Sequence, residues 1–142
     1  MGIKDANNMG AAMAPAALDT LLTHFSDTGR NPSYYDAIIS GDLGLVGKDI
    51  LLDLAEKSGY NIKSVYNDCG AMIFKKEKQD THSGGSGCGC IASVFSGYLY
   101  NELKKKNLGK VLLIATGALM NSMSAQQGES IPGIAQAISI EI

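Results

Sequence analysis

The sequence predicts an α/β protein, and two observations carry this prediction. Apolar residues recur at three- and four-residue spacing in residues 11–25, 45–58 and 91–106, which is typical of helices with one buried face. Between them lie short apolar runs at 35–40 and 111–116, which read as buried strands. Helices that alternate with buried strands favour an α/β fold, and 142 residues without an internal repeat favour a single domain, residues 1–142.

The first half of the chain contains two predicted helices around one predicted strand. In the helix at 11–25, Pro15 is expected to produce a kink or to mark the first turn. Residues 26–33 contain every common turn former and predict a loop. The strand at 35–40 runs into the turn at 41–44, and the helix at 45–58 ends at Gly59 as its C-cap.

The second half is less regular. Residues 60–80 contain a predicted turn at 67–70 and a charged loop at 75–80. The third helix at 91–106 is expected to bury Val94, Tyr98 and Leu99, among others, on its apolar face. A strand at 111–116, a polar segment at 121–132 and a last strand within 133–142 complete the chain, with clean alternation only from residue 138.

Composition restricts the class of protein. A hydrophobic fraction of 45% with 18% charged residues is typical of a globular chain. The formal net charge of −2 gives no electrostatic case for nucleic acid or for an anionic membrane surface. No apolar run approaches the roughly 20 residues that cross a bilayer, and the start carries no hydrophobic signal segment. Three cysteines suggest free thiols in a reducing compartment, so we expect a soluble intracellular protein.

A glycine-rich stretch at residues 81–90 is the first candidate site. Four glycines and two cysteines directly precede a predicted helix, whose first N–H groups and positive dipole end favour an anion. The predicted donors are the backbone N–H groups of Gly87, Cys88, Gly89 and Cys90 and the hydroxyl of Ser86, and Gly85 is a further predicted residue of the site. The alternative is a tight turn packed under the sheet, in which the glycines allow close backbone approach.

Two further residue types in this region have alternative interpretations. Protonated His82 would add a charge-assisted hydrogen bond, whereas a histidine in a polar loop can equally be solvated. Cys88 and Cys90 at a helix start could have lowered thiol pKa values, or could be small side chains in a crowded turn. Together with Cys69 and His82 they lack the spacing of a zinc site.

The remaining candidates are acidic or amide side chains. Asp42 and Asp68 follow strand-like segments and could hold a divalent ion, or could cap a helix or a turn. Gln127 and Glu129 lie in a segment that could close over the site or remain a solvated loop.

Six motifs resemble the stage V sporulation protein AD family: they are residues 7–17, 40–44, 68–70, 84–90, 115–119 and 127–135. The resemblance implies one C-terminal half of a duplicated thiolase-like fold, with a mixed sheet and flanking helices. It also implies an endospore-forming bacterium and binding of dipicolinic acid, pyridine-2,6-dicarboxylate. The implied partners are this ligand, with no cofactor except calcium that accompanies it, and membrane proteins of the same sporulation channel at the inner membrane of the forespore.

Family members are more than twice as long as this chain and have two similar halves. The chain resembles the C-terminal half from just after that half's first strand, so the resemblance implies a missing N-terminal half as a further partner. A gene fragment, a split gene and a cloned piece would all have this sequence. An isolated half would expose the apolar face meant for its partner and form a homo-oligomer.

The resemblance also allows an enzyme to be considered. Gly41 stands where a thiolase-type enzyme places one catalytic His or Asn, and Cys88 stands where it places the second. Gly117 and Ala118 stand near the position of the late cysteine. Glycine offers no side-chain donor for a developing oxyanion and a thiol is a weak one, so we expect a non-catalytic binding protein. The alternatives are an acyltransferase that acts with a separate N-terminal half, and a structural piece without a ligand site.

Overall fold

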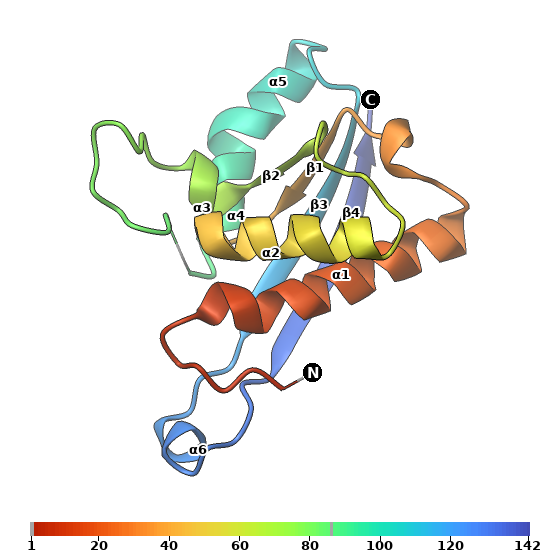
Figure 1. Cartoon of the computed structure of the whole chain (residues 1–142). Helices are drawn as coiled ribbons and strands as arrows, with labels where there is room; N and C mark the ends of the chain where they lie inside the picture. Colours follow the sequence, from red (N-terminus) through yellow and green to blue (C-terminus); the bar gives the residue numbers. More distant parts are fainter. Residues whose placement is uncertain (1, 86) are drawn as a thin grey trace.

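The structure is a computed structural model that describes residues 2–85 and 87–142. It contains one four-stranded sheet with helices on both faces (Figure 1). The strands are β1 (Ala37–Ser40), β2 (Tyr66–Asp68), β3 (Lys110–Ala118) and β4 (Gly133–Glu141). The helices are α1 (Met9–Thr28), η1 (Pro32–Tyr34), α2 (Gly44–Lys57), α3 (Cys69–Met72), α4 (Cys90–Val94), η2 (Phe95–Leu99), α5 (Tyr100–Lys104) and α6 (Ser122–Gln126). The predicted α/β fold with a mixed sheet is confirmed.

The sheet has the strand order β2-β1-β3-β4, in which β1 is parallel to β2 and β3, and β4 is antiparallel to β3. Alternate residues of each strand point to opposite faces. Ile38 and Leu112 pack with α1 and α2 in one hydrophobic cluster, whereas Ile39 and Leu113 pack with α4, η2 and α5 in a second cluster. The buried β1 and β3 therefore separate two cores, as their continuous apolar runs predict.

Helix α1 is longer than the predicted 11–25. It begins after Asn8, whose side-chain oxygen accepts a hydrogen bond from the Ala11 N–H at 3.0 Å. It continues to Thr28 and ends at Gly29, which has φ of 66°. The predicted loop at 26–33 is therefore wrong for residues 26–28, which continue the helix. The helix ends only at Gly29, because glycine readily adopts the left-handed conformation of a helix end. Pro15 lies inside the helix, not at its first turn.

The predicted helix at 91–106 is interrupted by a π-helical turn, η2. The Tyr100 N–H donates to the Phe95 carbonyl, five residues back, so the helix contains one extra residue in this turn. The extra residue rotates the positions that follow. Leu99 is 1% exposed, whereas Tyr98 is 52% exposed. The prediction that Tyr98 lies on the buried face is therefore wrong.

Four short elements, η1, β2, α3 and α6, were not predicted. Strand β2 has three residues, too few to give a recognisable alternation, and it overlaps the first two residues of the predicted turn at 67–70. Helix α6 lies in the polar segment at 121–132 and buries none of its residues. Within residues 2–85 and 87–142, no helix has the length and apolar character needed to cross a bilayer.

Candidate functional site

A polar cavity of about 190 Å³ lies where the first turns of α1 and α2 meet the glycine-rich stretch. Its lining residues come from the N-terminal segment, the turn after β1 and the stretch before α4. They are Asn7, Asn8, Met9, Gly10, Asp42, Leu43, Gly44, Val46, Ser83, Gly84 and Gly85. The structure therefore brings together two of the predicted site residues, Asp42 and Gly85, from segments 43 positions apart in the sequence.

Asp68 holds the elements beneath this cavity together. Its Oδ2 accepts hydrogen bonds from Ser40 Oγ at 2.6 Å and from the Leu43 N–H at 3.0 Å. Its Oδ1 accepts from the Gly44 N–H at 2.8 Å and from the Ala71 N–H at 3.2 Å. Burial raises the pKa of this carboxyl, although the four donors favour its ionised form. The capping interpretation of Asp68 is therefore confirmed, because it caps α3 and fixes the turn that begins α2.

Asp42 connects the same turn to the glycine-rich stretch. Its Oδ1 accepts a hydrogen bond from Thr116 Oγ1 at 2.6 Å, and its Oδ2 accepts from the Gly87 N–H at 3.0 Å. The side chain is buried but lines the polar cavity. Asp42 therefore positions the stretch before α4 against the ends of β1 and β3.

The glycines of the stretch pack backbone against backbone. The Leu45 N–H donates to the Ser83 carbonyl at 2.6 Å, and the Gly85 N–H donates to the Gly70 carbonyl at 2.8 Å. A Cβ on Gly84, which has φ of +102°, would collide with the Gly70 carbonyl. This geometry matches the tight-turn interpretation of Gly84 and Gly85 and leaves binding of a ligand there a prediction.

Two of the N–H groups predicted to hold an anion already have partners. The Gly87 N–H donates to Asp42, and the Cys90 N–H donates to the Gly87 carbonyl at 3.0 Å. The N–H groups of Cys88 and Gly89 have no partner among residues 2–85 and 87–142. Ser86, whose hydroxyl is one of the predicted donors, lies outside the described residues.

The cysteines divide into buried and exposed thiols. Cys69 and Cys90 are buried, whereas Cys88 is exposed. Burial raises the pKa of the Cys69 thiol to about 12 and also raises the pKa of the Cys90 thiol. Of the two interpretations of Cys90, the lowered thiol pKa is therefore wrong, because desolvation disfavours the thiolate there. Cys90 instead fits the alternative of a small side chain packed in the turn.

The other predicted site residues lie outside the polar cavity. The His82 side chain is 89% exposed and lies 3.7 Å from Asp80 Oδ1, in keeping with a solvated loop. Gln127 and Glu129 are both exposed, and Glu129 lines a separate hollow beside α6. Within the described residues, no three His, Cys, Asp or Glu side chains gather as a metal-ion site.

Sequence reasoning missed two polar side chains near the carboxyl ends of parallel strands, Ser40 and Thr116, and a third, Tyr66, at the start of β2. Ser40 ends β1, and its Oγ lies 2.7 Å from the Tyr66 hydroxyl, whose pKa is raised by burial. Thr116 lies near the end of β3 and bonds to Asp42. The position of Ser40 and Thr116 at the ends of predicted strands could have indicated them, since the carboxyl ends of parallel strands meet at one edge of a sheet and commonly form ligand-binding sites. Gly41 lies at the same edge, and a Cβ on it would come within 3.1 Å of the Thr116 N and Oγ1 atoms.

Comparison with known proteins gives one consistent result. A family model described as "Stage V sporulation protein AD (SpoVAD)" matches residues 1–141. The chain is 41% identical over 141 residues to "Stage V sporulation protein AD" of Bacillus subtilis (strain 168). The match covers 99% of this chain and 41% of that relative, so the chain spans less than half of the relative's length.

Proposed function

Because this chain belongs to the stage V sporulation protein AD family, we propose that it binds dipicolinic acid without catalysis and assists its uptake into the developing spore. The observation that carries the proposal is the polar cavity between α1, α2 and the glycine-rich stretch. Its volume of about 190 Å³ is below the ~300–1,000 Å³ of sites for drug-sized ligands, which suits a single planar ring with two carboxylates.

The ends of two helices support an anionic ligand in this cavity. Helices α1 and α2 cross closely at their first turns, where a Cβ on Gly47 would come within 2.8 Å of the Gly10 Cα. The N-terminal N–H groups of a helix lack partners inside the helix and carry its positive dipole end. In α2, the Gly44 and Leu45 N–H groups are engaged by Asp68 and Ser83, so α1 offers the freer donors.

Because Asp42 lines the cavity, we propose that a cation binds there together with the ligand. Its carboxylate lines the cavity and would repel a dicarboxylate, but it could share a divalent ion with that ligand. Calcium prefers carboxylate and carbonyl oxygens and is the ion we propose to accompany dipicolinate. We therefore expect binding of dipicolinate to be stronger in the presence of calcium.

The family, and the part of its relative that this chain does not cover, indicate which partners to propose. Since the chain spans 41% of its relative, we propose that the activity of a whole family member also uses the remaining length. In this proposal the remaining length is an N-terminal, thiolase-like half. Membrane proteins of the sporulation channel hold the assembly at the inner membrane of the forespore. The acyltransferase alternative gains no support from Cys69 and Cys90, whose buried thiols have raised pKa values.

Calorimetric titration of dipicolinate, with and without calcium, tests the proposed function. The informative variant is Asn7→Asp, which adds a negative charge at the rim of the cavity without removing a side-chain hydrogen bond to a described residue. In the absence of calcium, we expect the added charge to repel dipicolinate and to raise its Kd about tenfold, which corresponds to about 1.4 kcal/mol. The matched control is Asn61→Asp, which keeps the oxygen that accepts from the Lys63 N–H and lies outside the cavity. No heat with the unaltered chain, or equal Kd values for both variants, would contradict the proposed site.

A further inference from the structure

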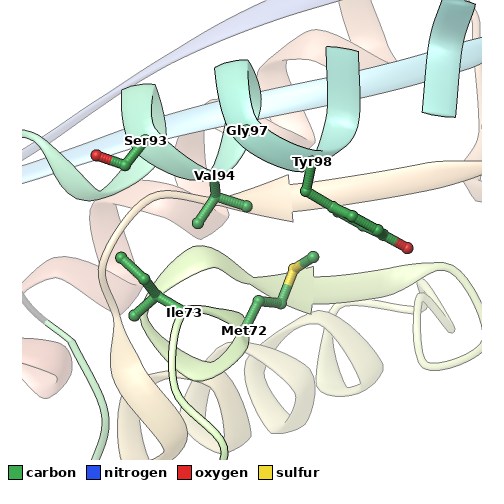
Figure 2. A pocket seen from close by; sticks show the side chains of 6 residues that line it. All are labelled: Met72, Ile73, Ser93, Val94, Gly97 and Tyr98. Atoms are coloured by element: carbon green, nitrogen blue, oxygen red, sulfur yellow. The ribbon is translucent and has the colours of Figure 1, made fainter. Parts of the chain in front are cut away.

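Two apolar hollows flank the helical segment α4–η2–α5, on the face of the sheet opposite α1 and α2. The larger, of about 430 Å³, is lined by Met72, Ile73, Ser93, Val94, Gly97 and Tyr98, and Figure 2 shows Val94 and Tyr98 directed toward Ile73 and Met72. The smaller, of about 290 Å³, lies between this segment and strands β3 and β4. Since the described residues that line them include no Asp, Glu, His, Lys or Arg, we expect neither hollow to respond to pH near neutrality.

Charged and aromatic side chains gather instead where the end of α1 meets the end of β4 (Figure 1). Arg30, just after α1, reaches two residues of β4. Its Nη1 donates to Ser139 Oγ at 2.9 Å, and its Nη2 lies 2.8 Å from Glu141 Oε1. We call this cluster the latch, and it consists of His24, Arg30, Tyr34, Tyr35, Lys110, Ser139 and Glu141.

Tyr35 lies at the centre of the latch and is 2% exposed. Its hydroxyl oxygen accepts a hydrogen bond from Arg30 Nη1 at 3.1 Å and lies 2.5 Å from His24 Nε2. Because the guanidinium only donates, the hydroxyl hydrogen is available to another acceptor, and His24 is nearer than Ser139 Oγ at 3.4 Å. An Nε2 that accepts this hydrogen carries no proton of its own, so the latch is built for neutral His24.

The groups around His24 disfavour its protonation. The Arg30 guanidinium shares the Tyr35 oxygen with the imidazole, so protonation would place two cations on one half-buried hydroxyl group. The rings of Phe25 and Tyr35 also pack beside the imidazole. Burial lowers the pKa of His24 and Arg30 lowers it further, whereas Asp27, one turn along α1, opposes them.

The other charged groups of the latch act on the far side of Arg30. Glu141 pairs with Arg30 and accepts from the Tyr34 hydroxyl at 3.0 Å. The Tyr34 ring lies between two cations, with Arg30 at 4.4 Å and Lys110 at 4.0 Å from its centre. Glu141 therefore holds Arg30 in place, and Arg30 in turn connects β4 to the Tyr35 hydroxyl.

We propose that the latch is a pH-sensitive switch, in which protonation of His24 releases the end of β4 from α1. A protonated imidazole donates from both nitrogens and cannot accept the Tyr35 hydrogen. Arg30 repels it, and Asp27, three residues along the helix, attracts it toward solvent. Tyr35 then loses its nearest acceptor, and the contacts that orient Arg30 toward β4 are disrupted.

The release is confined to one end of the strand. Nearer the start of β4, Thr20 Oγ1 of α1 donates to the Ala135 carbonyl at 3.1 Å, and this bond contains no group that titrates near neutral pH. Protonation of His24 therefore loosens β4 around Ser139 and Glu141 while Ala135 stays attached to α1.

The sign of the effect follows from the lowered pKa. The folded chain binds the His24 proton less tightly than the unfolded chain, in which the pKa is about 6.5. The stability that neutral His24 contributes is complete above this value and falls as the pH drops toward the folded-state pKa.

Thermal unfolding at several pH values tests the switch. We expect the Tm of the unaltered chain to fall by several degrees between about pH 7.5 and about pH 5.5. His24→Gln keeps an oxygen that can accept from Tyr35 and cannot gain a charge, so its Tm is expected to fall less. The matched control His82→Gln removes an exposed histidine and is expected to behave like the unaltered chain. Asp68, whose pKa is raised, is present in all three chains, so its contribution cancels.

Hydrogen exchange shows where the chain loosens. The Ile142 N–H donates to the Gly109 carbonyl beside the latch, and the Leu119 N–H donates to the Pro132 carbonyl at the opposite end of the β3–β4 pair, both at 3.0 Å. After correction for the intrinsic exchange rate at each pH, we expect protection of the Ile142 amide to fall about fivefold over the same range. Protection of the Leu119 amide is expected to stay constant, and His24→Gln is expected to abolish the change at Ile142.

Two results would overturn the proposal. One is a fall in Tm that is equally large in the unaltered chain and in His24→Gln. The other is an Ile142 amide that is unprotected at pH 7.5, or that loses protection no more than the Leu119 amide as the pH falls, because the end of β4 would then not be held by neutral His24.

Discussion

Two buried carboxylates at the ends of the parallel strands hold the elements around the candidate site together. Asp68 accepts four hydrogen bonds and Asp42 accepts two, so each carboxylate takes donors from more than one element. Both stay inside the molecule because hydrogen bonds offset the cost of burying a charge. The sequence indicated both residues, but it did not indicate their donors, which come from Ser40, Thr116 and backbone N–H groups.

A third carboxylate, Asp36, makes the stability of the fold depend on pH. Its Oδ2 accepts hydrogen bonds from the Gly109 N–H at 2.7 Å and the Lys110 N–H at 2.9 Å. These bonds lower the pKa of the carboxyl, Gly109 having the larger effect. A lowered folded-state pKa stabilises the fold fully above the unfolded value of about 3.9. That stabilisation is lost as the pH falls through the folded-state pKa.

We therefore predict that Asp36→Asn lowers Tm at pH 7 and that its difference from the unaltered chain narrows toward pH 3. Thermal unfolding followed by circular dichroism across this range measures the effect. Asp19→Asn, at an exposed position of α1, controls for the loss of one negative charge. A difference that stays constant with pH would show that the hydrogen bonds of Asp36 do not depend on its ionised state.

At the scale of elements, the glycine-rich stretch is a packed turn that borders the cavity. We predict that Gly84→Ala lowers the free energy of unfolding by more than the ~1–2 kcal/mol that a left-handed conformation costs alanine, because its Cβ also meets the Gly70 carbonyl. Urea unfolding provides the measurement. Gly128→Ala is the matched control, since Gly128 has φ of +73° and open space around it. Equal losses in the two variants would mean that the contact with Gly70 does not constrain the stretch.

The long elements were predictable from sequence because their apolar patterns extend over several turns or strand residues. This holds for α1, α2 and β3, whose existence and type agree with the structure. The π turn at Phe95–Leu99 was not predictable, because a single extra residue in a helix leaves the apolar spacing nearly unchanged. Strand β2 has three residues and depends on pairing with β1, a contact between distant segments that no local pattern reveals.

The candidate site also depends on contacts between distant segments, which no local sequence pattern reveals. Asp42 and the glycine-rich stretch stand out in the sequence, and the structure does place Asp42 and Gly85 around one cavity. Asn7 and Asn8 join them only because α1 and α2 cross at Gly10 and Gly47. His82 was grouped with the site because it lies in the glycine-rich stretch, and Gln127 and Glu129 because their segment could close over the site. None of the three lines the polar cavity.

In the whole molecule, the polar cavity and the apolar hollows on the other face of the sheet are lined by different residues. The cavity lies beside α1 and α2, whereas the two apolar hollows flank the segment α4–η2–α5. We expect Gly97→Glu, at an exposed position of η2 away from the polar cavity, to leave the dipicolinate Kd unchanged.

The most direct measurement is a titration of the ¹⁵N-labelled chain with dipicolinate and calcium, followed by amide chemical shifts. We expect the largest shifts at the amides around the polar cavity, in Asn8, Gly10, Val46 and Gly85. The amides of Gly97 and Tyr98, beside the larger apolar hollow, are expected to remain unchanged. No shifts at saturating ligand, or shifts confined to that hollow, would contradict a dipicolinate site in the polar cavity.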